Sequence, residues 1–177
     1  MSSKRLAALT ALIVVLVAPA SGSATSTNGA LSRSARMQAA LLAHVNAVRS
    51  ARGLVRLRLA PGLNAAAAVH STQMARLGYF SHNSANGTSF SKRVASFYPL
   101  RGYRSWMVGE NLVWASPDLG AARAIKVWLA SPPHRANLLD PRWREIGLSA
   151  VHSTSAPGVY GGSPATIVTA DFGTRNR

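Results

Sequence analysis

The chain has 177 residues, with twenty Lys and Arg against five Asp and Glu, a formal net charge of +15 and no cysteine. This length suits one domain with a sizeable core and is too short for two. Without cysteine the chain can form neither a disulfide framework nor a lipid-modified cysteine, so the apolar core must hold the fold. The basic residues are spread along the chain rather than clustered, which argues against a nucleic-acid-binding arm.

Residues 1–24 have the pattern of a secretory signal, in which a basic start precedes an apolar run and then small residues. The apolar run is shorter than the ~20 residues that a membrane span needs. We therefore expect cleavage after Ala20 or Ala24, no transmembrane anchor afterwards, and a flexible spacer over residues 25–33. The expected location is secreted, extracellular or associated with the cell envelope.

Export and the basic charge together indicate the kind of partner. Nucleic acid is not expected outside the cell, whereas an anionic envelope polymer would be attracted to a basic surface. An arginine-rich surface that only keeps the protein soluble explains the charge equally well, and both interpretations stay open.

The spacing of apolar residues predicts helices over residues 34–52, 61–77, 89–97 and 118–131. Pro61 and Gly78 stand at the start and just past the end of the second helix. Asp118 is placed to cap the fourth. The Pro132-Pro133 pair is expected to end that helix, so that His134 begins a loop.

The second half of the chain contains the strand patterns. Residues 146–151 and 165–172 alternate or are rich in β-branched side chains, and a Gly/Ser/Pro-rich segment separates them. These two strands are expected to pair antiparallel. Residues 54–60 predict a short extended connector, and residues 98–109 predict a loop. Helices first and strands last indicate an α+β fold.

A scattered His–Glu–His set is the strongest functional signal. Glu110 stands among apolar neighbours, and burying a carboxylate is costly unless a partner shares its charge or donates hydrogen bonds to it. His82 and His134 are the obvious partners. If the three side chains converge, they form a polar pocket in an apolar setting. The alternative is a hydrogen-bonded network that only pins the surrounding loops.

Four phrases in this order resemble the CAP superfamily of cysteine-rich secretory, antigen 5 and pathogenesis-related proteins, and most closely its bacterial SCP-like members. They are Gly78-Tyr79-Phe80-Ser81-His82, Gly109-Glu110-Asn111-Leu112, His134-Arg135-Ala136-Asn137 and Asp171-Phe172-Gly173. The resemblance covers roughly residues 37–173. It implies a single domain over residues 34–175, folded as an α–β–α sandwich with a small, mainly antiparallel sheet between helices.

The resemblance also implies a cavity lined by two histidines and two glutamates. His82, Glu110 and His134 match three of these positions, whereas the second glutamate position, three residues after Trp128, is Ser131. With one carboxylate missing, calcium affinity should drop, because calcium needs several oxygen ligands. Zinc or another divalent metal held by His82, His134 and Glu110 remains an open alternative.

Three further residues are candidates for the same cavity. Ser131 could donate into it, although capping its own helix explains it as well. Asn137 is expected to hydrogen-bond loop backbone. His70 lies on an apolar helical stripe, where a histidine is more often part of the core.

The favoured interpretation is a monomeric, secreted binding module for a small-molecule, lipid or cell-wall ligand. The alternative is a metal-dependent hydrolase using His82, in which Glu110 or His134 activates water. No nucleophile motif or zinc-protease motif is present, so an enzyme is the less favoured of the two.

Overall fold

The computed structural model describes residues 23–177, with side chains from Arg33 onward. The predicted secretory signal therefore lies almost wholly outside the described residues. The helices are α1 (Ser23–Ser50), α2 (Pro61–Leu77), α3 (Phe90–Phe97), α4 (Ala121–Ala130) and α5 (Pro132–Leu138), with the 3-10 turn η1 (Gly158–Tyr160). The strands are β1 (Arg58–Leu59), β2 (Ser105–Ala115), β3 (Glu145–Ser153) and β4 (Ala165–Asn176).

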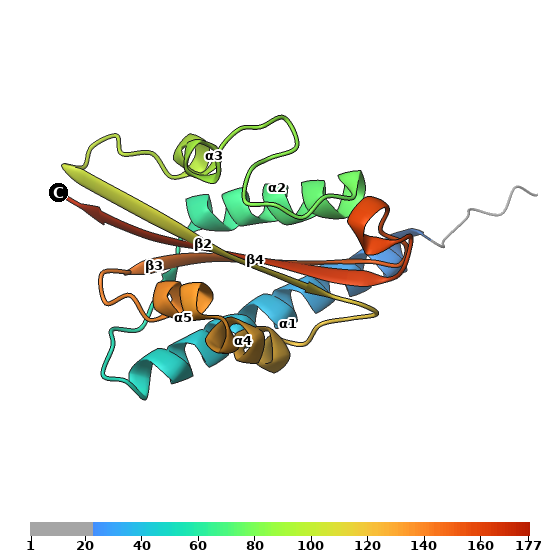
Figure 1. Ribbon diagram of the computed structural model, residues 1–177, viewed down its shortest axis with the longest axis horizontal. Coiled ribbons are helices and arrows are strands. Elements are labelled where there is room, and N and C mark those ends of the chain that lie inside the picture. Colours follow the sequence, from blue (N-terminus) through green and yellow to red (C-terminus); the bar gives the residue numbers. More distant parts are fainter. Residues whose placement is uncertain (1–22) are drawn as a thin grey trace, which may run out of the picture.

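The four strands form one sheet in the order β1-β3-β4-β2, with helices on both faces. β4 pairs antiparallel with both β2 and β3, and the two-residue β1 pairs parallel with β3. Figure 1 shows α2 and α3 on one face of the sheet and α1, α4 and α5 on the other. The expected α+β sandwich with a mainly antiparallel sheet is therefore confirmed.

The core lies on both faces of the sheet. Between the sheet and α1, α4 and α5, side chains such as Leu41, Ile125, Trp128 and Phe172 are at most 4% exposed. Trp128 satisfies its only polar group by donating its indole N–H to the carbonyl oxygen of Leu112, 3.0 Å away. Burying each large apolar side chain stabilises the fold by about 1.5–3 kcal/mol relative to exposure.

The N-terminal end of α2 touches the backbone of β3. A Cβ at Gly147 would lie 2.0 Å from the carbonyl carbon of Leu63, so only glycine permits this approach. Alongside, the side-chain oxygen of Asn64 accepts the backbone N–H of Leu148 at 2.9 Å. This contact sets how α2 lies across the sheet.

The predicted helices differ from the observed ones mainly at their starts. α2 spans residues 61–77 as predicted, and Gly78 ends it with φ of 71°. α1 begins at Ser23 rather than at residue 34, so the segment predicted as a spacer is helical. α4 begins only at Ala121, and Asp118 does not cap it. Leu119 is buried in the core, so the chain before α4 is extended to reach it.

The Pro132-Pro133 pair starts a helix rather than a loop. Both prolines lie in the first turn of α5, where the missing N–H costs nothing and the fixed φ suits the helix. His134 is therefore helical, which corrects the prediction that it begins a loop. No helix in the part of the chain from residue 23 onward is long and apolar enough to cross a membrane.

β2 was also not predicted from the sequence, which assigns residues 98–109 to a loop. Gly109, Glu110 and Asn111 at its centre all have low or modest strand propensity. The strand forms because β4 offers it a continuous antiparallel partner along its whole length. Pairing with β4 thus outweighs the low strand propensity of the residues around Glu110.

Replacing Gly147 by alanine should destabilise the protein by about 1–3 kcal/mol or more, because neither backbone can move aside without separating α2 from β3. Gly120→Ala is the matched control, because a Cβ there meets nothing within 4 Å. Urea denaturation of both variants measures the difference. Equal stabilities would contradict the close approach of α2 to β3.

Candidate functional site

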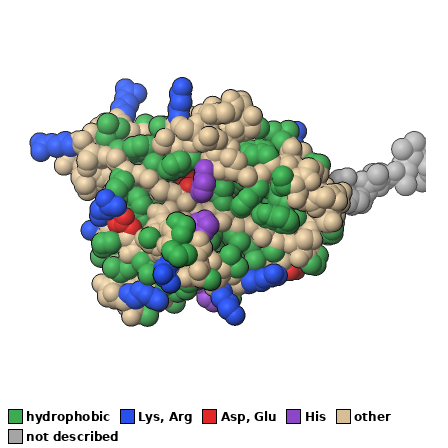
Figure 2. Space-filling model, in the orientation of Figure 1, with side chains coloured by type: hydrophobic (Ala, Val, Ile, Leu, Met, Phe, Trp, Pro, Cys, Tyr) green, Lys and Arg blue, Asp and Glu red, His purple; other side chains and the backbone are tan. Residues whose placement is uncertain are grey.

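Glu110 lies in the middle of β2, and its side chain is only 1% exposed. Its partner in the strand register is Asp171 on β4, so two carboxyl groups stand on adjacent strands. Figure 2 shows histidine side chains and an acidic side chain together in the middle of one face, between the two helical layers.

Both oxygens of the Glu110 carboxylate have partners. Oε1 accepts a hydrogen bond from Nδ1 of His82 at 2.7 Å, and Oε2 is bound by the guanidinium of Arg93. The Nε2 atom of His70 lies 3.8 Å from the same Oε2. A buried charge is tolerated only with such pairing, so these contacts explain how the carboxylate can lie inside the sheet.

Arg93 and His70 also hold the backbone of the loop that carries His82. Arg93 Nη1 donates to the carbonyl oxygen of His82 at 2.9 Å and to Oγ of Ser84 at 3.3 Å. His70 Nε2 donates to the carbonyl oxygen of Ser81 at 2.9 Å. The loop is therefore fixed from α2 and from α3, while the His82 side chain stays 52% exposed.

His134 forms the other half of the site, on α5. Its Nδ1 is 2.8 Å from Oγ of Ser131. Asn111 on β2 donates to the carbonyl oxygen of His134 at 2.9 Å and accepts from Nδ2 of Asn137 at 3.0 Å. Burial, and then the positive charge that His82 can carry, lower the pKa of His134. The two Asn side chains thus tie α5 to the strand that holds Glu110.

Asp171 is completely buried, and neither of its oxygens accepts a hydrogen bond from a described N–H or hydroxyl group. Burial raises its pKa well above the ordinary value, and the negative charge of Glu110 raises it further. The raised pKa favours the protonated, uncharged form of Asp171. Glu110 then carries the charge of the pair, opposite Arg93.

His70 is a buried neutral member of this cluster. Burial lowers its pKa to about 4, and the positive charge of Arg93 also lowers it, against the opposing effect of Glu110. Because Nε2–H is donated to Ser81, Nδ1 is the acceptor, and the hydroxyl of Tyr79 lies 3.4 Å from it.

The sequence-predicted residues divide into two groups. His82, Glu110 and His70 are in contact. Ser131, which lies between α4 and α5, forms a second group with His134 and Asn137 of α5, and Asn111 joins this group to the first. The sequence predicts that Asn137 hydrogen-bonds loop backbone. In the structure its side chain instead donates to the side-chain oxygen of Asn111.

Arg93, Asp171 and Tyr79 are members of the site that were not predicted from the sequence. Asp171 carried a usable signal, because it is one of only five acidic residues and stands in an apolar strand. Arg93 carried no such signal, because its neighbouring residues in the sequence do not distinguish it from the other arginines.

The donor set does not fit a metal ion. Within residues 33–177, no three His, Cys, Asp or Glu side chains are grouped so that they could hold one. Arg93 already binds one oxygen of Glu110, His82 binds the other through Nδ1, and Nδ1 of His134 faces Ser131.

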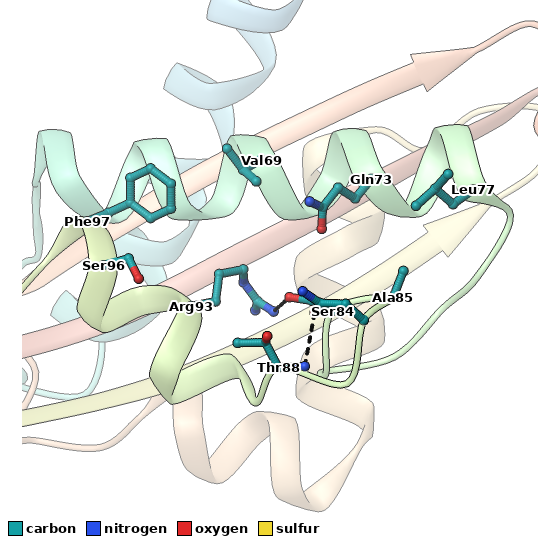
Figure 3. Close-up of a pocket in the computed structure, with 10 residues that line it drawn as sticks. Val69, Gln73, Leu77, Ser84, Ala85, Thr88, Arg93, Ser96 and Phe97 are labelled. Carbon is teal, nitrogen blue, oxygen red and sulfur yellow. Dashed lines mark hydrogen bonds between the residues drawn. The ribbon is translucent and has the colours of Figure 1, made fainter.

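A groove of about 350 Å³ adjoins the site between α2, α3 and the loop over residues 84–88. Figure 3 shows residues of α2 along one side, with Arg93 pointing toward Ser84 across the groove. Its lining mixes apolar, amide and hydroxyl side chains: Val69, Gln73, Leu77, Ser84, Ala85, Asn86, Thr88, Arg93, Ser96 and Phe97. Arg93 is common to the groove and to the Glu110 cluster.

The sequence matches the family model described as CAP, the Cysteine-rich secretory protein family, over residues 42–172. Among curated proteins, the uncharacterized protein YkwD of Bacillus subtilis (strain 168) is 32% identical over 110 residues. Those residues are 62% of this chain and 40% of YkwD.

Solved structures share the fold. An extracellular protein containing an SCP domain from Bacillus anthracis str. Ames matches with a TM-score of 0.64 and 22% identity, over 91% of this chain and 45% of that one. An outer surface protein from Borrelia burgdorferi matches with a TM-score of 0.61 and 18% identity, over 77% of this chain and 90% of that one. The chain spans less than half the length of YkwD and of the B. anthracis protein.

The low pKa of His70 predicts a loss of stability in acid. The unfolded chain binds a proton at this histidine near pH 6.5, whereas the folded chain does so only at about 4. The contribution of neutral His70 to the free energy of unfolding is therefore complete above pH 6.5 and is lost as the pH falls toward 4. This shift corresponds to roughly 3 kcal/mol.

Urea denaturation at several pH values across that window measures the loss. His70→Gln should flatten the pH dependence, because glutamine does not titrate and can still donate to Ser81. His44→Gln, at an exposed histidine of α1, is the control and should leave the pH dependence unchanged. An equally steep loss in His70→Gln would contradict the assignment.

Proposed function

Because the chain belongs to the CAP family of cysteine-rich secretory proteins, we propose that it is an exported binding module. Its ligand is small, amphipathic or part of the cell wall, and it is held at the face that carries His82 and His134. The observation that carries the proposal is the hydrogen bond of 2.7 Å between His82 Nδ1 and Glu110, which orients a half-exposed imidazole from within the sheet.

The groups that face outward are imidazoles rather than carboxylates. His82 uses Nδ1 on Glu110, and His134 uses Nδ1 on Ser131, so the Nε2 atom of each ring remains for a ligand. Because Nδ1–H of His82 is donated to the Glu110 carboxylate, Nε2 of the neutral ring is an acceptor. If the Ser131 hydroxyl donates to His134, that ring carries its hydrogen on Nε2. His134 can then donate to an acidic oxygen, and His82 can accept from a hydroxyl or amide group of the same ligand.

Charge favours the same class of ligand. Glu110 is already paired with Arg93, so the site offers no free carboxylate to a cation. Lys and Arg side chains project around the rim of this face in Figure 2, and the whole chain carries +15. Such a field attracts carboxylate or phosphate groups, with a strength that falls as salt rises.

The groove between α2 and α3 supports an amphipathic ligand. Leu77 is 60% exposed there and Phe97 is 39% exposed, beside hydroxyl and amide side chains. An apolar part could lie along α2 while an acidic end reaches the imidazoles. The signal-like N-terminus and the extracellular or outer-surface relatives support export.

Binding can be tested by NMR, following the imidazole resonances of His82 and His134. Three probes are added separately: inorganic phosphate, a purified anionic wall polymer and phosphatidylglycerol vesicles. The double variant His82→Ala/His134→Ala should bind the effective probe at least about tenfold more weakly, since hydrogen bonds to charged groups contribute about 1.5–3 kcal/mol.

His152→Ala is the matched control for that experiment, because His152 is exposed on β3 and contacts Thr166 rather than the site. It should bind as the unaltered protein does. Equal binding by the double variant would show that only the general basic charge attracts these probes.

Hydrolysis is the second candidate, favoured by the same His82–Glu110 pair, because a carboxylate that orients an imidazole is typical of a general base. Glu110 itself is enclosed and paired, so it would position His82 rather than touch a substrate. If the protein hydrolyses peptides, esters or wall fragments, His82→Ala should lower the rate by about 100-fold or more, with His152→Ala as control. A rate that His82→Ala does not change would exclude this mechanism.

A further inference from the structure

We propose that Arg93 is the built-in cation of this site, so that the cluster around Glu110 works without a divalent metal and excludes one. The proposal concerns the chemistry of the buried cluster, and it stands whether or not the face above it binds an acidic ligand. It rests on the contacts of Arg93, on the state of the neighbouring ligand atoms and on the geometry at Glu110.

Arg93 occupies the position that a bound cation would need. It is 5% exposed, and one guanidinium nitrogen binds Oε2 of Glu110 while another binds the carbonyl oxygen of His82 and Oγ of Ser84. A divalent metal likewise holds a carboxylate and fixes the loops around it. Here the side chain of Arg93 makes those contacts, and it is covalently attached to α3.

An arginine guanidinium keeps its charge in proteins, so Arg93 cannot release Glu110 by losing a proton. A divalent cation entering beside it would meet a like charge in a buried setting, where repulsion is only weakly screened. The Glu110 oxygen that such a cation would need is already bound by the Arg93 guanidinium.

The imidazoles nearest the carboxylate are also committed. A metal ligand must offer a free lone pair. His82 Nδ1 faces Glu110, and His70 Nε2 donates to the carbonyl oxygen of Ser81. His70 is moreover fully buried. The ring nitrogens closest to Glu110 are therefore donors in this arrangement and not acceptors of a metal. Nε2 of His82 keeps its lone pair, but within residues 33–177 no three His, Cys, Asp or Glu side chains are grouped so that they could complete a metal site with it.

Removing the guanidinium would free a pair of ligand atoms. His70 Nε2 lies 3.8 Å from Oε2 of Glu110, the oxygen that Arg93 now binds. Two ligands of a tetrahedral zinc ion, each at about 2.0–2.1 Å from the metal, lie roughly 3.3 Å apart. A small shift of His70 away from Ser81 would bring both atoms to one metal, with Asp171 or His82 nearby.

The test measures zinc affinity by competition with a chromophoric chelator, at neutral pH, for the unaltered protein and for Arg93→Gln and Arg93→Lys. We expect no zinc uptake in competition with the chelator by the unaltered protein or by Arg93→Lys, which keeps the charge. Arg93→Gln should bind zinc at least about tenfold more tightly, on the scale by which neighbouring groups tune metal sites.

Arg49→Gln is the matched control. Arg49 is also a fully buried arginine, but it donates to carbonyl oxygens of Val55, Leu138 and Asp140 instead of to a carboxylate. Its replacement should not create zinc binding. If Arg93→Gln does not fold, as judged by circular dichroism, Arg93→Met keeps the packing of the stem and takes its place in the comparison.

Two results would overturn the proposal. One is stoichiometric zinc bound by the unaltered protein and lost in His82→Ala. The other is a folded Arg93→Gln or Arg93→Met protein that binds zinc no better than the unaltered protein does. Neither result depends on the acidic-ligand experiment, so failure here leaves the proposed binding function to be judged by its own measurement.

Discussion

The buried charge of Glu110 is the constraint on which the arrangement of this site depends. A carboxylate inside a sheet must be paired and hydrogen-bonded, because the cost of removing it from water is otherwise several kcal/mol or more. The pairing is supplied by Arg93 from α3 and by His82 from the loop before it. Satisfying one charge therefore places a helix and a loop against β2, which explains how a loop residue can present its side chain in a defined direction.

The same constraint gives the site its chemical character. Two carboxyl groups stand opposite each other on β2 and β4, and burial together with the negative charge of Glu110 raises the pKa of Asp171. Imidazoles form the outer layer of the site. On the far side, Asn111 connects β2 to α5 and so places His134 on the same face. The site therefore has a hydrogen-bonded interior and imidazole side chains toward its surface.

Elements whose signals lie within a short segment could be predicted. Pro61 and Gly78 mark the ends of α2 because each acts through its own backbone geometry. The Pro132-Pro133 pair is ambiguous in the sequence, because proline can end one helix and can also occupy the first turn of the next. In the structure it does both: α4 ends before the pair and α5 begins with it. β2 could not be predicted from Gly109, Glu110 and Asn111, because its stability comes from pairing with β4, a segment far away along the chain.

By itself, the sequence determined the family, the α+β sandwich and the need of Glu110 for a partner, because a lone carboxylate among apolar residues is improbable without one. It also named His82 as a partner for that carboxylate, and these two side chains are in contact. Only the tertiary structure decided that Arg93 is the cation and that Asp171 lies opposite. Many arginines look alike along the chain, and the choice among them depends on which one comes within hydrogen-bonding reach when α3 packs against the sheet. That distance is a property of the assembled fold and is not encoded in any single segment.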